Sequence, residues 1–423
     1  MIRRIEALNY RCLRYIDQEL GDFQVLVGPN ASGKTTFLDV VAFLGDLVTG
    51  GLEQAIEERT QNFQDLVWQR SGDRFELAIE LMIPGERREL LKRVPYNLVR
   101  YEVAIGLEEA TNETAILAER VFLKMDDPYQ EKPQHNQLSL FPMQHEAPRT
   151  LISSTKVKNT KTVINKVSGG NDNFYSEVYP AKGKGWAPSF KLGPRRSALG
   201  NLPADEAKFP VSTWLKGLLT EGVQRIILNS LLMRKASPPG QGRRFRPDGS
   251  NLPWVIEHFK SIAPEGFSEW LAHLQTALPD IRTIRTVEMP DNKHRYLIIE
   301  YAGGLNVPSW MASDGTLRLL ALTLPAYLPE FTGIYLIEEP ENGIHPRAVE
   351  AMFQSLSSVY AAQILLATHS SVILSVAEAR QVLCFAKTSN GAVDIVLGTE
   401  HPALRDWKGE TNLGVLFAGG VLG

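Results

Sequence analysis

The sequence predicts an α/β fold with a mixed sheet, an antiparallel β-subdomain and a helical insertion. Near the N-terminus, an apolar strand over residues 23–27 precedes a glycine-rich loop and an apolar helix over residues 36–44. Near the C-terminus, a second apolar strand over residues 334–337 ends in two glutamates. Between them lie strand-like segments, a polar stretch and then helical segments. These observations indicate two halves of one α/β domain, separated by an insertion.

The glycine-rich loop has the complete pattern G-x-x-x-x-G-K-T. It consists of Gly28, Pro29, Asn30, Ala31, Ser32, Gly33, Lys34 and Thr35, and Thr36 follows in the helix. Glycine permits backbone conformations that other residues resist. The order strand, loop, helix turns backbone N–H groups and a helix N-terminus toward phosphates. We expect Lys34 to reach the β- and γ-phosphates of a nucleotide and the Thr35 hydroxyl to ligate Mg²⁺.

Composition limits the choice of partners and compartment. The 423 residues carry 45 Lys plus Arg against 48 Asp plus Glu, so any affinity for nucleic acid must come from a local patch. The two cysteines, Cys12 and Cys384, favour a reducing compartment over a disulfide framework. The polar N-terminus does not resemble a signal peptide, and no apolar run reaches the ~18 residues of a membrane span. We therefore expect a cytoplasmic protein without a membrane segment.

The first part of the chain contains two further groups that could face a nucleotide. Arg11 lies in the turn between strands predicted over residues 2–8 and 15–20, where its guanidinium either reaches a phosphate or remains an ordinary surface group. The amide-rich loop over residues 60–68 and its neighbour offer three glutamines that could sense Mg²⁺ or the attacking water. They are Gln61, Gln64 and Gln69, and the sequence does not rank them.

The middle of the chain predicts a β-meander, a polar tract and a helical region. Alternation predicts antiparallel strands over residues 75–83, 98–107 and 115–124. The polar tract over residues 125–195 interleaves lysines with aromatic residues, so it either contacts nucleic acid or is a solvated insertion. Helices are predicted over residues 212–232, 252–262 and 267–278. A second basic loop over residues 234–246 either meets phosphate or is a plain exposed loop.

The C-terminal strand ends in groups suited to phosphate chemistry. Glu338 is expected to hold the magnesium ion and its waters, and Glu339 to orient and deprotonate the attacking water. His369 follows the next predicted strand, where an imidazole can hydrogen-bond a γ-phosphate. Ser313, Asp314 and Gly315 open another helix, which offers a second N-terminus for an anion. Since the phosphate loop already serves its own nucleotide, this second N-terminus is interpreted as a cap for the nucleotide of another subunit.

Together these motifs resemble the ABC-type P-loop ATPases, in the SMC-like and overcoming-lysogenization-defect group. The resemblance covers roughly residues 1–70 and 305–390. It implies that the glycine-rich loop is the Walker A motif, residues 334–339 the Walker B strand and residues 342–346 the D-loop. It further implies that Ser313, Asp314 and Gly315 form the signature, that His369 is the switch histidine and that Arg11 contacts phosphate. Glu338 stands where many members have aspartate, and Ser-Asp-Gly-Thr replaces the Ser-Gly-Gly of transporters.

The resemblance implies a domain organisation and a function. Residues 1–124 are expected to form the first half of the ATPase domain, 125–280 the insertion and 281–423 the second half. The resemblance implies that the chain is an ATPase and that it forms a head-to-tail dimer or higher oligomer with ATP and Mg²⁺ between subunits. The compact form resembles ATPase subunits of anti-phage systems, which implies control of a separate effector such as a nuclease. The alternative is a repair or recombination clamp that binds DNA directly. A non-hydrolysing scaffold is disfavoured by Lys34, Glu339 and His369. The apolar end, residues 413–423, either docks a partner or is a buried helix.

Overall fold

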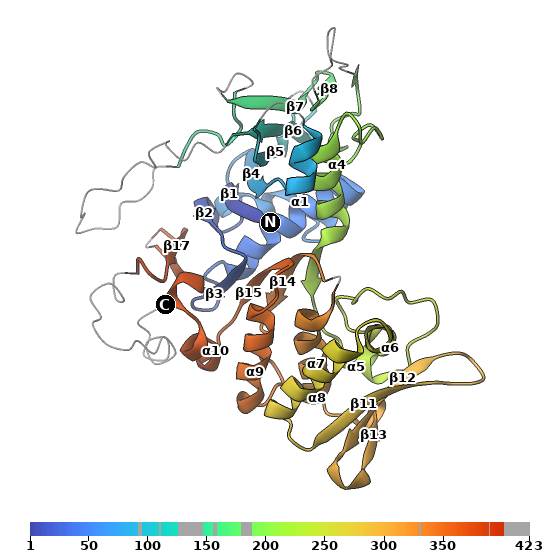
Figure 1. The fold of residues 1–423 in the computed structure, drawn as a ribbon. Coiled ribbons are helices and arrows are strands. Elements are labelled where there is room, and N and C mark those ends of the chain that lie inside the picture. The colour runs from blue at the N-terminus through green and yellow to red at the C-terminus, as the bar shows by residue number, and fades with distance from the viewer. Residues whose placement is uncertain are drawn as a thin grey trace. The chain divides into compact units, whose positions relative to one another are not determined.

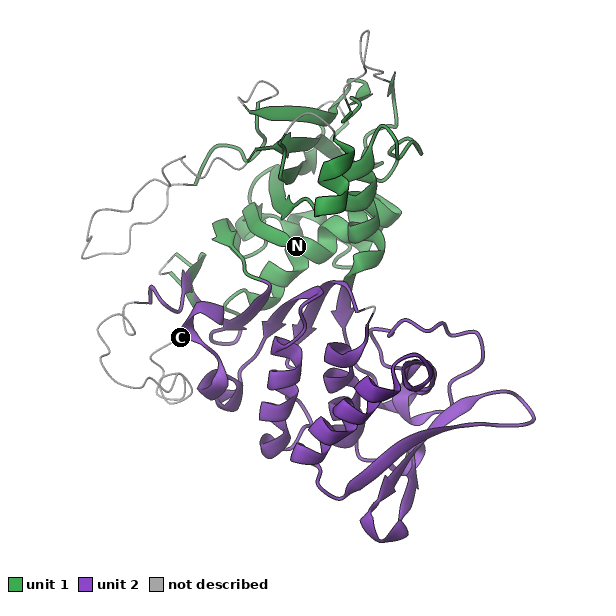
Figure 2. Ribbon diagram, viewed as in Figure 1, with its two compact units in different colours: residues 1–21, 31–223, 386–395 green, residues 22–30, 224–385, 396–423 purple. Residues whose placement is uncertain are grey.

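The computed structural model describes residues 1–91, 95–109, 111–125, 147–154, 159–178, 188–329, 331–388 and 390–401. It divides the chain into two compact units (Figure 2). Unit 1 comprises residues 1–21, 31–223 and 386–395, and unit 2 comprises residues 22–30, 224–385 and 396–423. Each unit draws on segments that are far apart in the sequence. The three predicted domain ranges are a different partition and stay a prediction.

An eight-stranded sheet forms the framework of unit 1 (Figure 1). Its order is β2-β1-β4-β5-β6-β7-β8-β9, and the neighbouring strands pair antiparallel. The strands are β1 (Ile2–Tyr10), β2 (Leu13–Glu19), β4 (Arg74–Met82), β5 (Leu98–Leu107), β6 (Thr114–Lys124), β7 (Thr160–Val167), β8 (Asp172–Phe174) and β9 (Ser189–Phe190). The predicted meander is confirmed as β4, β5 and β6.

Helix α1 (Lys34–Gly50) packs on this sheet through aromatic side chains. Phe43 of the helix meets Tyr10 and Phe75 of the sheet at ring-centroid distances of 5.8 and 5.5 Å. The helix ends at Gly51, which has a φ of 85°. The remaining helical segments of unit 1 are α2 (Leu52–Glu57), η1 (Phe63–Leu66), η2 (Trp68–Arg70), α3 (Gly85–Leu90), α4 (Pro210–Gly217) and η3 (Leu218–Gly222).

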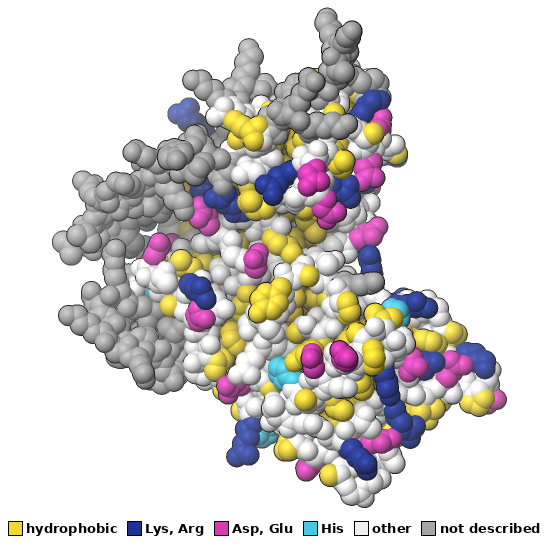
Figure 3. Space-filling view, in the orientation of Figure 1, with side chains coloured by type: hydrophobic (Ala, Val, Ile, Leu, Met, Phe, Trp, Pro, Cys, Tyr) yellow, Lys and Arg dark blue, Asp and Glu magenta, His cyan; other side chains and the backbone are white. Residues whose placement is uncertain are grey.

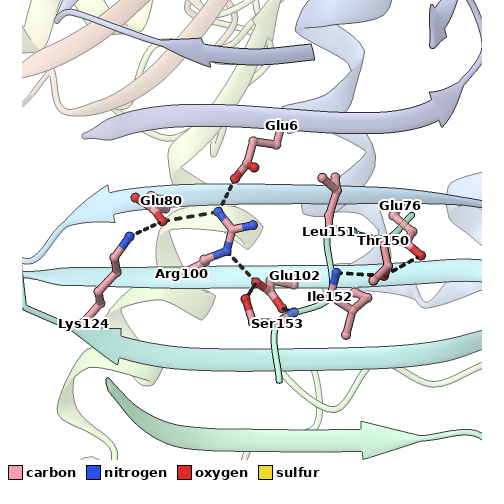
Figure 4. Close-up of polar contacts among 10 residues, drawn as sticks. All are labelled: Glu6, Glu76, Glu80, Arg100, Glu102, Lys124, Thr150, Leu151, Ile152 and Ser153. Atoms are coloured by element: carbon pink, nitrogen blue, oxygen red, sulfur yellow. Dashed lines mark hydrogen bonds and ion pairs between the residues drawn. The ribbon is translucent and has the colours of Figure 1, made fainter. Parts of the chain in front are cut away.

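The other side of the sheet in unit 1 carries a buried charge network centred on Arg100 (Figure 4). The Arg100 guanidinium pairs with Glu6, with Glu80 at 3.3 Å and with Glu102 at 2.5 Å. Lys124 adds a second cation, 2.9 Å from Glu80. Burial alone would raise the pKa of Glu80, but the charges of Arg100 and Lys124 outweigh it and lower that pKa.

The same face holds a short segment against the sheet. Glu76 accepts hydrogen bonds from the Thr150 hydroxyl and from the backbone N–H of Leu151, and Glu102 accepts two from Ser153 (Figure 4). The buried carboxylates of β4 and β5 therefore serve two tasks. Glu80 and Glu102 neutralise Arg100, and Glu76 and Glu102 accept hydrogen bonds from the backbone N–H groups of Leu151 and Ser153.

A largely parallel sheet forms the framework of unit 2. Its order is β10-β14-β15-β3-β16-β17, and the pairs β14·β15, β15·β3 and β3·β16 are parallel. The strands are β3 (Phe23–Val27), β10 (Val223–Ile226), β14 (Gly333–Glu338), β15 (Ala362–Ala367), β16 (Val382–Lys387) and β17 (Val393–Leu397). The first residue of β10, the last two residues of β16 and the first three residues of β17 fall within the ranges of unit 1. Every residue of β15 is buried, as expected for a parallel strand covered on both faces.

Helices and a small antiparallel sheet complete unit 2. Trp270 and Thr323 lie in the core between helices, where the indole N–H donates to the Thr323 hydroxyl at 3.0 Å. The helices are α5 (Ser230–Arg234), α6 (Leu252–Ile262), α7 (Pro264–Ala277), α8 (Asp314–Thr323), α9 (Pro346–Ser357) and α10 (Ser371–Val376), with 3-10 turns η4 (Ala302–Gly304), η5 (Ser309–Met311), η6 (Leu324–Tyr327) and η7 (Ala379–Gln381). The small sheet has the order β11-β12-β13, formed by β11 (Ile281–Glu288), β12 (Arg295–Tyr301) and β13 (Asn306–Pro308).

One prediction for the middle of the chain is wrong, and two other segments contain structure that the sequence did not indicate. The helix predicted over residues 212–232 is instead α4, a π-helical turn, the strand β10 and the short helix α5. The apolar spacing fits a helix, but pairing beside β14 places residues 223–226 in a sheet, and tertiary pairing overrides propensity. The polar tract over residues 125–195 contains the strands β7, β8 and β9, which extend the sheet of unit 1. In and beside the predicted amide-rich loop over residues 60–68, residues 63–66 and 68–70 form two 3-10 turns.

None of the helices in the described ranges is long and apolar enough to cross a membrane.

Removing the central guanidinium of the buried network tests this account. Arg100→Ala is expected to lower the free energy of unfolding by about 3–5 kcal/mol, because buried carboxylates lose their counter-charge. The control is Arg87→Ala, which breaks a more exposed pair with Glu206 and should cost about 0–1 kcal/mol. Urea unfolding followed by circular dichroism measures both variants. Equal losses in the two variants would contradict the assigned role of Arg100.

Candidate nucleotide site

The phosphate loop adopts a backbone that requires glycine. Gly28, Ala31 and Gly33 have φ values of 150°, 60° and 101°. A Cβ on Gly33 would lie 2.6 Å from Val393 Cγ2 and 3.3 Å from Cys12 Sγ. At position 33, the backbone φ disfavours any residue with a side chain, and the neighbouring atoms leave no space for a Cβ.

Polar groups of the loop gather where α1 begins. Lys34 is the first residue of α1 and is buried, whereas Thr35 is exposed. Ser32 Oγ is buried and has no hydrogen-bond partner within the described part of the chain. Leaving a buried hydroxyl unpaired is costly, and a phosphate oxygen would satisfy it, so the loop fits a phosphate group. Of the other predicted loop residues, Gly28, Gly33 and Thr36 are buried, and Pro29, Asn30 and Ala31 are exposed.

Arg11 is tied to the first helix of unit 1. Its backbone has a φ of 51°, and its Nη1 lies 3.3 Å from Asp39 Oδ2. Asp39 also contacts Arg59 at 2.8 Å and accepts from the Tyr10 hydroxyl at 2.6 Å. Burial alone would raise the pKa of Asp39, but the bonds and charge of Arg59 outweigh it and lower that pKa. Sequence reasoning missed Asp39 and Arg59; the available signal was an acid inside an otherwise apolar helix.

In unit 2, three parallel strands end at the same edge of the sheet. The strand register aligns Glu338 with Ala367, and Ala367 with Leu26. Beyond the strands, the Glu339 N–H donates to the Ala367 carbonyl at 2.8 Å, and the Thr368 N–H donates to the Leu26 carbonyl at 3.1 Å. Glu338 and Glu339, the residues around His369 and the start of the glycine-rich loop therefore share one edge, where ligands of such sheets bind.

Glu339 and His369 lie together at this edge. The distance from Glu339 Oε1 to His369 Nε2 is 3.3 Å. Glu339 has a φ of 50°, in the left-handed region that side-chain-bearing residues seldom adopt. Such strained residues persist where the surrounding structure holds them, and they cluster at functional sites.

Glu338 has an arginine partner that the sequence did not indicate. Arg225 Nη2, on the edge strand β10, lies 3.1 Å from Glu338 Oε1. Arg225, Arg318, Glu338 and Glu339 are among the residues that line a cavity of about 310 Å³. The sequence analysis did not indicate the pairing of Arg225 with Glu338, because it predicted a helix over residues 212–232 instead of the strand β10.

The signature residues occupy a different cavity of unit 2. Ser313 caps α8, since its hydroxyl accepts from the Thr316 N–H at 3.1 Å. Asp314 pairs with Arg234 at 2.8 Å. A Cβ on Gly315 would lie 2.4 Å from the Gly343 carbonyl oxygen, so only glycine fits against the predicted D-loop. These residues line a cavity of about 430 Å³ that does not include Glu338 or Glu339 among its lining residues.

The three candidate glutamines lie in or beside the 3-10 turns of unit 1. Gln61 and Gln69 are exposed, and Gln69 has a φ of 52°. Gln64 is half-buried, and its Oε1 has no partner within the ranges that the structure covers. The structure does not single out one of them.

Several basic residues of the polar tract serve the fold. Lys166 is buried and pairs with Asp172 at 2.8 Å. Arg195 pairs with two glutamates of unit 1, and Phe174 is buried and stacks on Phe190 with ring centroids 5.1 Å apart. Lys156, Lys158, Lys182 and Lys184, and the apolar end over residues 413–423, lie outside the described residues.

A family model matches most of the chain. Residues 23–375 fit the family described as "AAA domain, putative AbiEii toxin, Type IV TA system". The chain belongs to this family. The match confirms the resemblance to the SMC-like and overcoming-lysogenization-defect group of ATPases.

Two solved SMC heads have the same fold. An Smc head bound to the C-winged helix domain of ScpA aligns with a TM-score of 0.52 at 13% identity, over 93% of this chain and 96% of that chain. An Smc head with an extended coiled coil, bound to the C-terminal domain of ScpA from Pyrococcus furiosus, aligns with a TM-score of 0.52 at 11% identity, over 93% and 95%. The predicted ABC-type α/β fold is therefore confirmed.

A shorter sequence match points to a nuclease of the same group. Over 50 residues the chain is 46% identical to an OLD nuclease of Thermus scotoductus. The match covers 12% of this chain and only 9% of that protein.

A methyl group at position 33 tests the geometry of the phosphate loop. Gly33→Ala is expected to abolish binding of a fluorescent ATP analogue and to lower the unfolding temperature, because it combines a disfavoured φ with a clash against Val393. The control is Gly391→Ala, at a φ of 83° with no atom within 4 Å of the added Cβ. That variant carries the backbone strain without the clash and should still bind. Normal binding by Gly33→Ala would contradict the assigned loop geometry.

Proposed function

We propose that this chain binds ATP with Mg²⁺ and hydrolyses it. The observation that carries the proposal is the edge of the parallel sheet in unit 2, where Glu339 lies 3.3 Å from His369 beside the strand that enters the phosphate loop. In this proposal the loop from Gly28 to Thr35 holds the phosphates, with Lys34 neutralising their charge. Thr35 and Glu338 hold Mg²⁺, which supplies positive charge to the phosphate oxygens when bound.

Glu339 is the general base in this proposal. Its backbone N–H donates to the Ala367 carbonyl, and its carboxylate lies against the His369 imidazole. A carboxylate held in this way can orient a water molecule and accept its proton. In this proposal the His369 imidazole hydrogen-bonds both Glu339 and a terminal phosphate oxygen, and so reports that a nucleotide is present.

The signature supports a head-to-tail dimer. Within one chain, Ser313, Asp314 and Gly315 line a different cavity from Glu338 and Glu339. A signature that does not face its own Walker B strand is free to cap the nucleotide of a second copy. Two-fold symmetry then generates both nucleotide sites from the same pair of surfaces. Arg11, bound to Asp39 beside α1, is assigned to phosphate contact in this arrangement.

We further propose that the ATPase controls a separate effector in anti-phage defence. The support is the family description, which names a toxin of a toxin–antitoxin system, and the local identity to an OLD nuclease. In this proposal ATP closes the dimer and hydrolysis releases it. The effector binds differently to the closed, ATP-bound dimer and to the form released after hydrolysis.

A second candidate function is direct binding of DNA, and the loop after α5 favours it. Arg243, Arg244 and Arg246 are exposed around Phe245, which is buried in the core of unit 2. Asn251, itself buried, accepts from the Arg246 N–H at 3.0 Å and donates to the Arg244 carbonyl at 2.7 Å. The bonds to Asn251 and the burial of Phe245 therefore fix the backbone that carries these three exposed arginines. On the face seen in Figure 3, however, basic and acidic side chains of the described residues are interspersed, which weakens the attraction of a long nucleic acid.

Blocking the base tests the ATPase and its dimer together. Glu339→Gln is expected to lower ATP turnover by at least about 100-fold while leaving ATP bound, because the amide cannot accept the proton. The variant should form a dimer in ATP and Mg²⁺, measured by light scattering after size exclusion. Lys34→Ala should neither bind ATP nor dimerise. A Glu339→Gln variant that stays monomeric in saturating ATP would refute the sandwich, and unchanged turnover would refute the assigned base.

Native mass spectrometry separates the two candidate roles. Glu339→Gln purified with ATP after expression from its own operon is expected to carry a second polypeptide in a fixed ratio. A bare dimer that binds DNA would favour the clamp instead. In that case affinity should fall steeply with salt, since phosphate contacts release counterions. The triple change Arg243→Ala, Arg244→Ala and Arg246→Ala should then remove DNA binding and leave ATP turnover intact.

A further inference from the structure

The turn after β14 contains a third glutamate that the proposed chemistry does not use. Glu341 lies two residues after Glu339, in a turn closed by a bond from the Asn342 N–H to the Glu339 carbonyl at 3.1 Å. It is half-buried, and its two carboxylate oxygens have different surroundings. One is bonded twice, while the other is buried without a partner among the described residues.

The bonded oxygen of Glu341 holds the segment that carries His369. Glu341 Oε1 accepts from the Thr368 hydroxyl at 2.5 Å and from the His369 backbone N–H at 3.2 Å. The Thr368 hydroxyl in turn accepts from the Ser370 N–H at 2.9 Å. Residues 368–370 are therefore all connected, directly or through Thr368, to one carboxylate oxygen.

This segment is fixed to the sheet on its other side. Thr368 is fully buried, and its N–H donates to the Leu26 carbonyl at 3.1 Å, at the end of the strand that enters the phosphate loop. The contacts of Glu341 therefore complete a brace between the turn after β14 and the segment after β15. His369 lies within this brace, with its Nε2 3.3 Å from Glu339.

We propose that Glu341 is a positioning residue that holds His369 against Glu339. The inference rests on the proposed ATPase function. Hydrogen bonds to an ionised carboxylate are among the strong ones, so Glu341 is a firm anchor for a backbone N–H and a buried hydroxyl. Without that anchor both donors lose their acceptor, and the His369 backbone gains freedom where the spacing to Glu339 is set. The nucleotide itself is held by the phosphate loop, so its binding should depend little on Glu341.

The two oxygens of Glu341 allow a matched pair of variants. Glu341→Gln can keep an acceptor at the Oε1 position and place its amide nitrogen at the Oε2 position, where no donor is recorded among the described residues. It removes the charge and preserves the brace. Glu341→Ala removes the brace entirely. Glu350→Ala is the control, since Glu350 is exposed on α9 and contacts only Gln354 among the recorded side-chain partners.

Steady-state ATP turnover and binding of a non-hydrolysable ATP analogue test the inference on the full chain. Glu341→Ala is expected to lower kcat by about 10- to 100-fold with analogue affinity unchanged, as when a group that orients a reacting residue is removed. Glu341→Gln should recover most of kcat, and Glu350→Ala should match the unmodified protein. Thr368→Val, which removes one donor of the brace, should lower kcat in the same direction, and Thr368→Ser should restore it.

Three outcomes would overturn the inference. Turnover by Glu341→Ala close to that of the unmodified protein would show that His369 does not need the brace. A Glu341→Gln variant as impaired as Glu341→Ala would show that the charge, and not the hydrogen bonds, matters. Loss of analogue binding by a folded Glu341→Ala would place the residue in binding instead. If the unmodified protein shows no turnover that depends on Glu339, the proposed function fails first, which separates the two results.

Discussion

The candidate site depends on the register of three parallel strands in unit 2. Backbone hydrogen bonds align the ends of β14, β15 and β3, so that Glu338, Ala367 and Leu26 lie at one level. The residues that directly follow each strand therefore lie at the same edge of the sheet. Because these strands are buried on both faces, a slip of one residue would turn every side chain to the opposite face and disrupt the close packing there, which makes the register costly to change.

Polar groups at the end of the sheet and at the start of α1 are held by partners far away in the sequence. Arg225 contacts Glu338 across 113 residues, and Thr368 reaches Glu341 across 27. Asp39 in unit 1 gathers Tyr10, Arg11 and Arg59 in the same manner. Each carboxylate thus has a charge or donor to offset its burial, as buried polar groups require. The same rule governs the larger network around Arg100, where no nucleotide motif is present.

The motifs at the two ends of the chain were predictable because they are local. The pattern from Gly28 to Thr35 requires particular φ values and a following helix, and both are read from adjacent residues. The meander β4–β6 was predictable from alternation. The strand β10 was not, because its few apolar residues fit a helix equally well until β14 is placed beside them. The strands β7 to β9 were missed for a similar reason, since Lys166 and Asp172 are buried only as a pair.

The sequence by itself indicated the family, and it predicted the phosphate loop, the acidic end of the strand over residues 334–337 and the position of His369, because each is a short pattern whose chemistry follows from neighbouring residues. The tertiary structure decided which acids have partners, which loop residues are buried, and that the signature and the Walker B glutamates line different cavities. It also decided the place of Glu341, whose bonds to Thr368 and His369 exist only once β14 and β15 pair. The physical reason is that pairing energies between distant segments depend on sheet register and burial, and no local pattern records either.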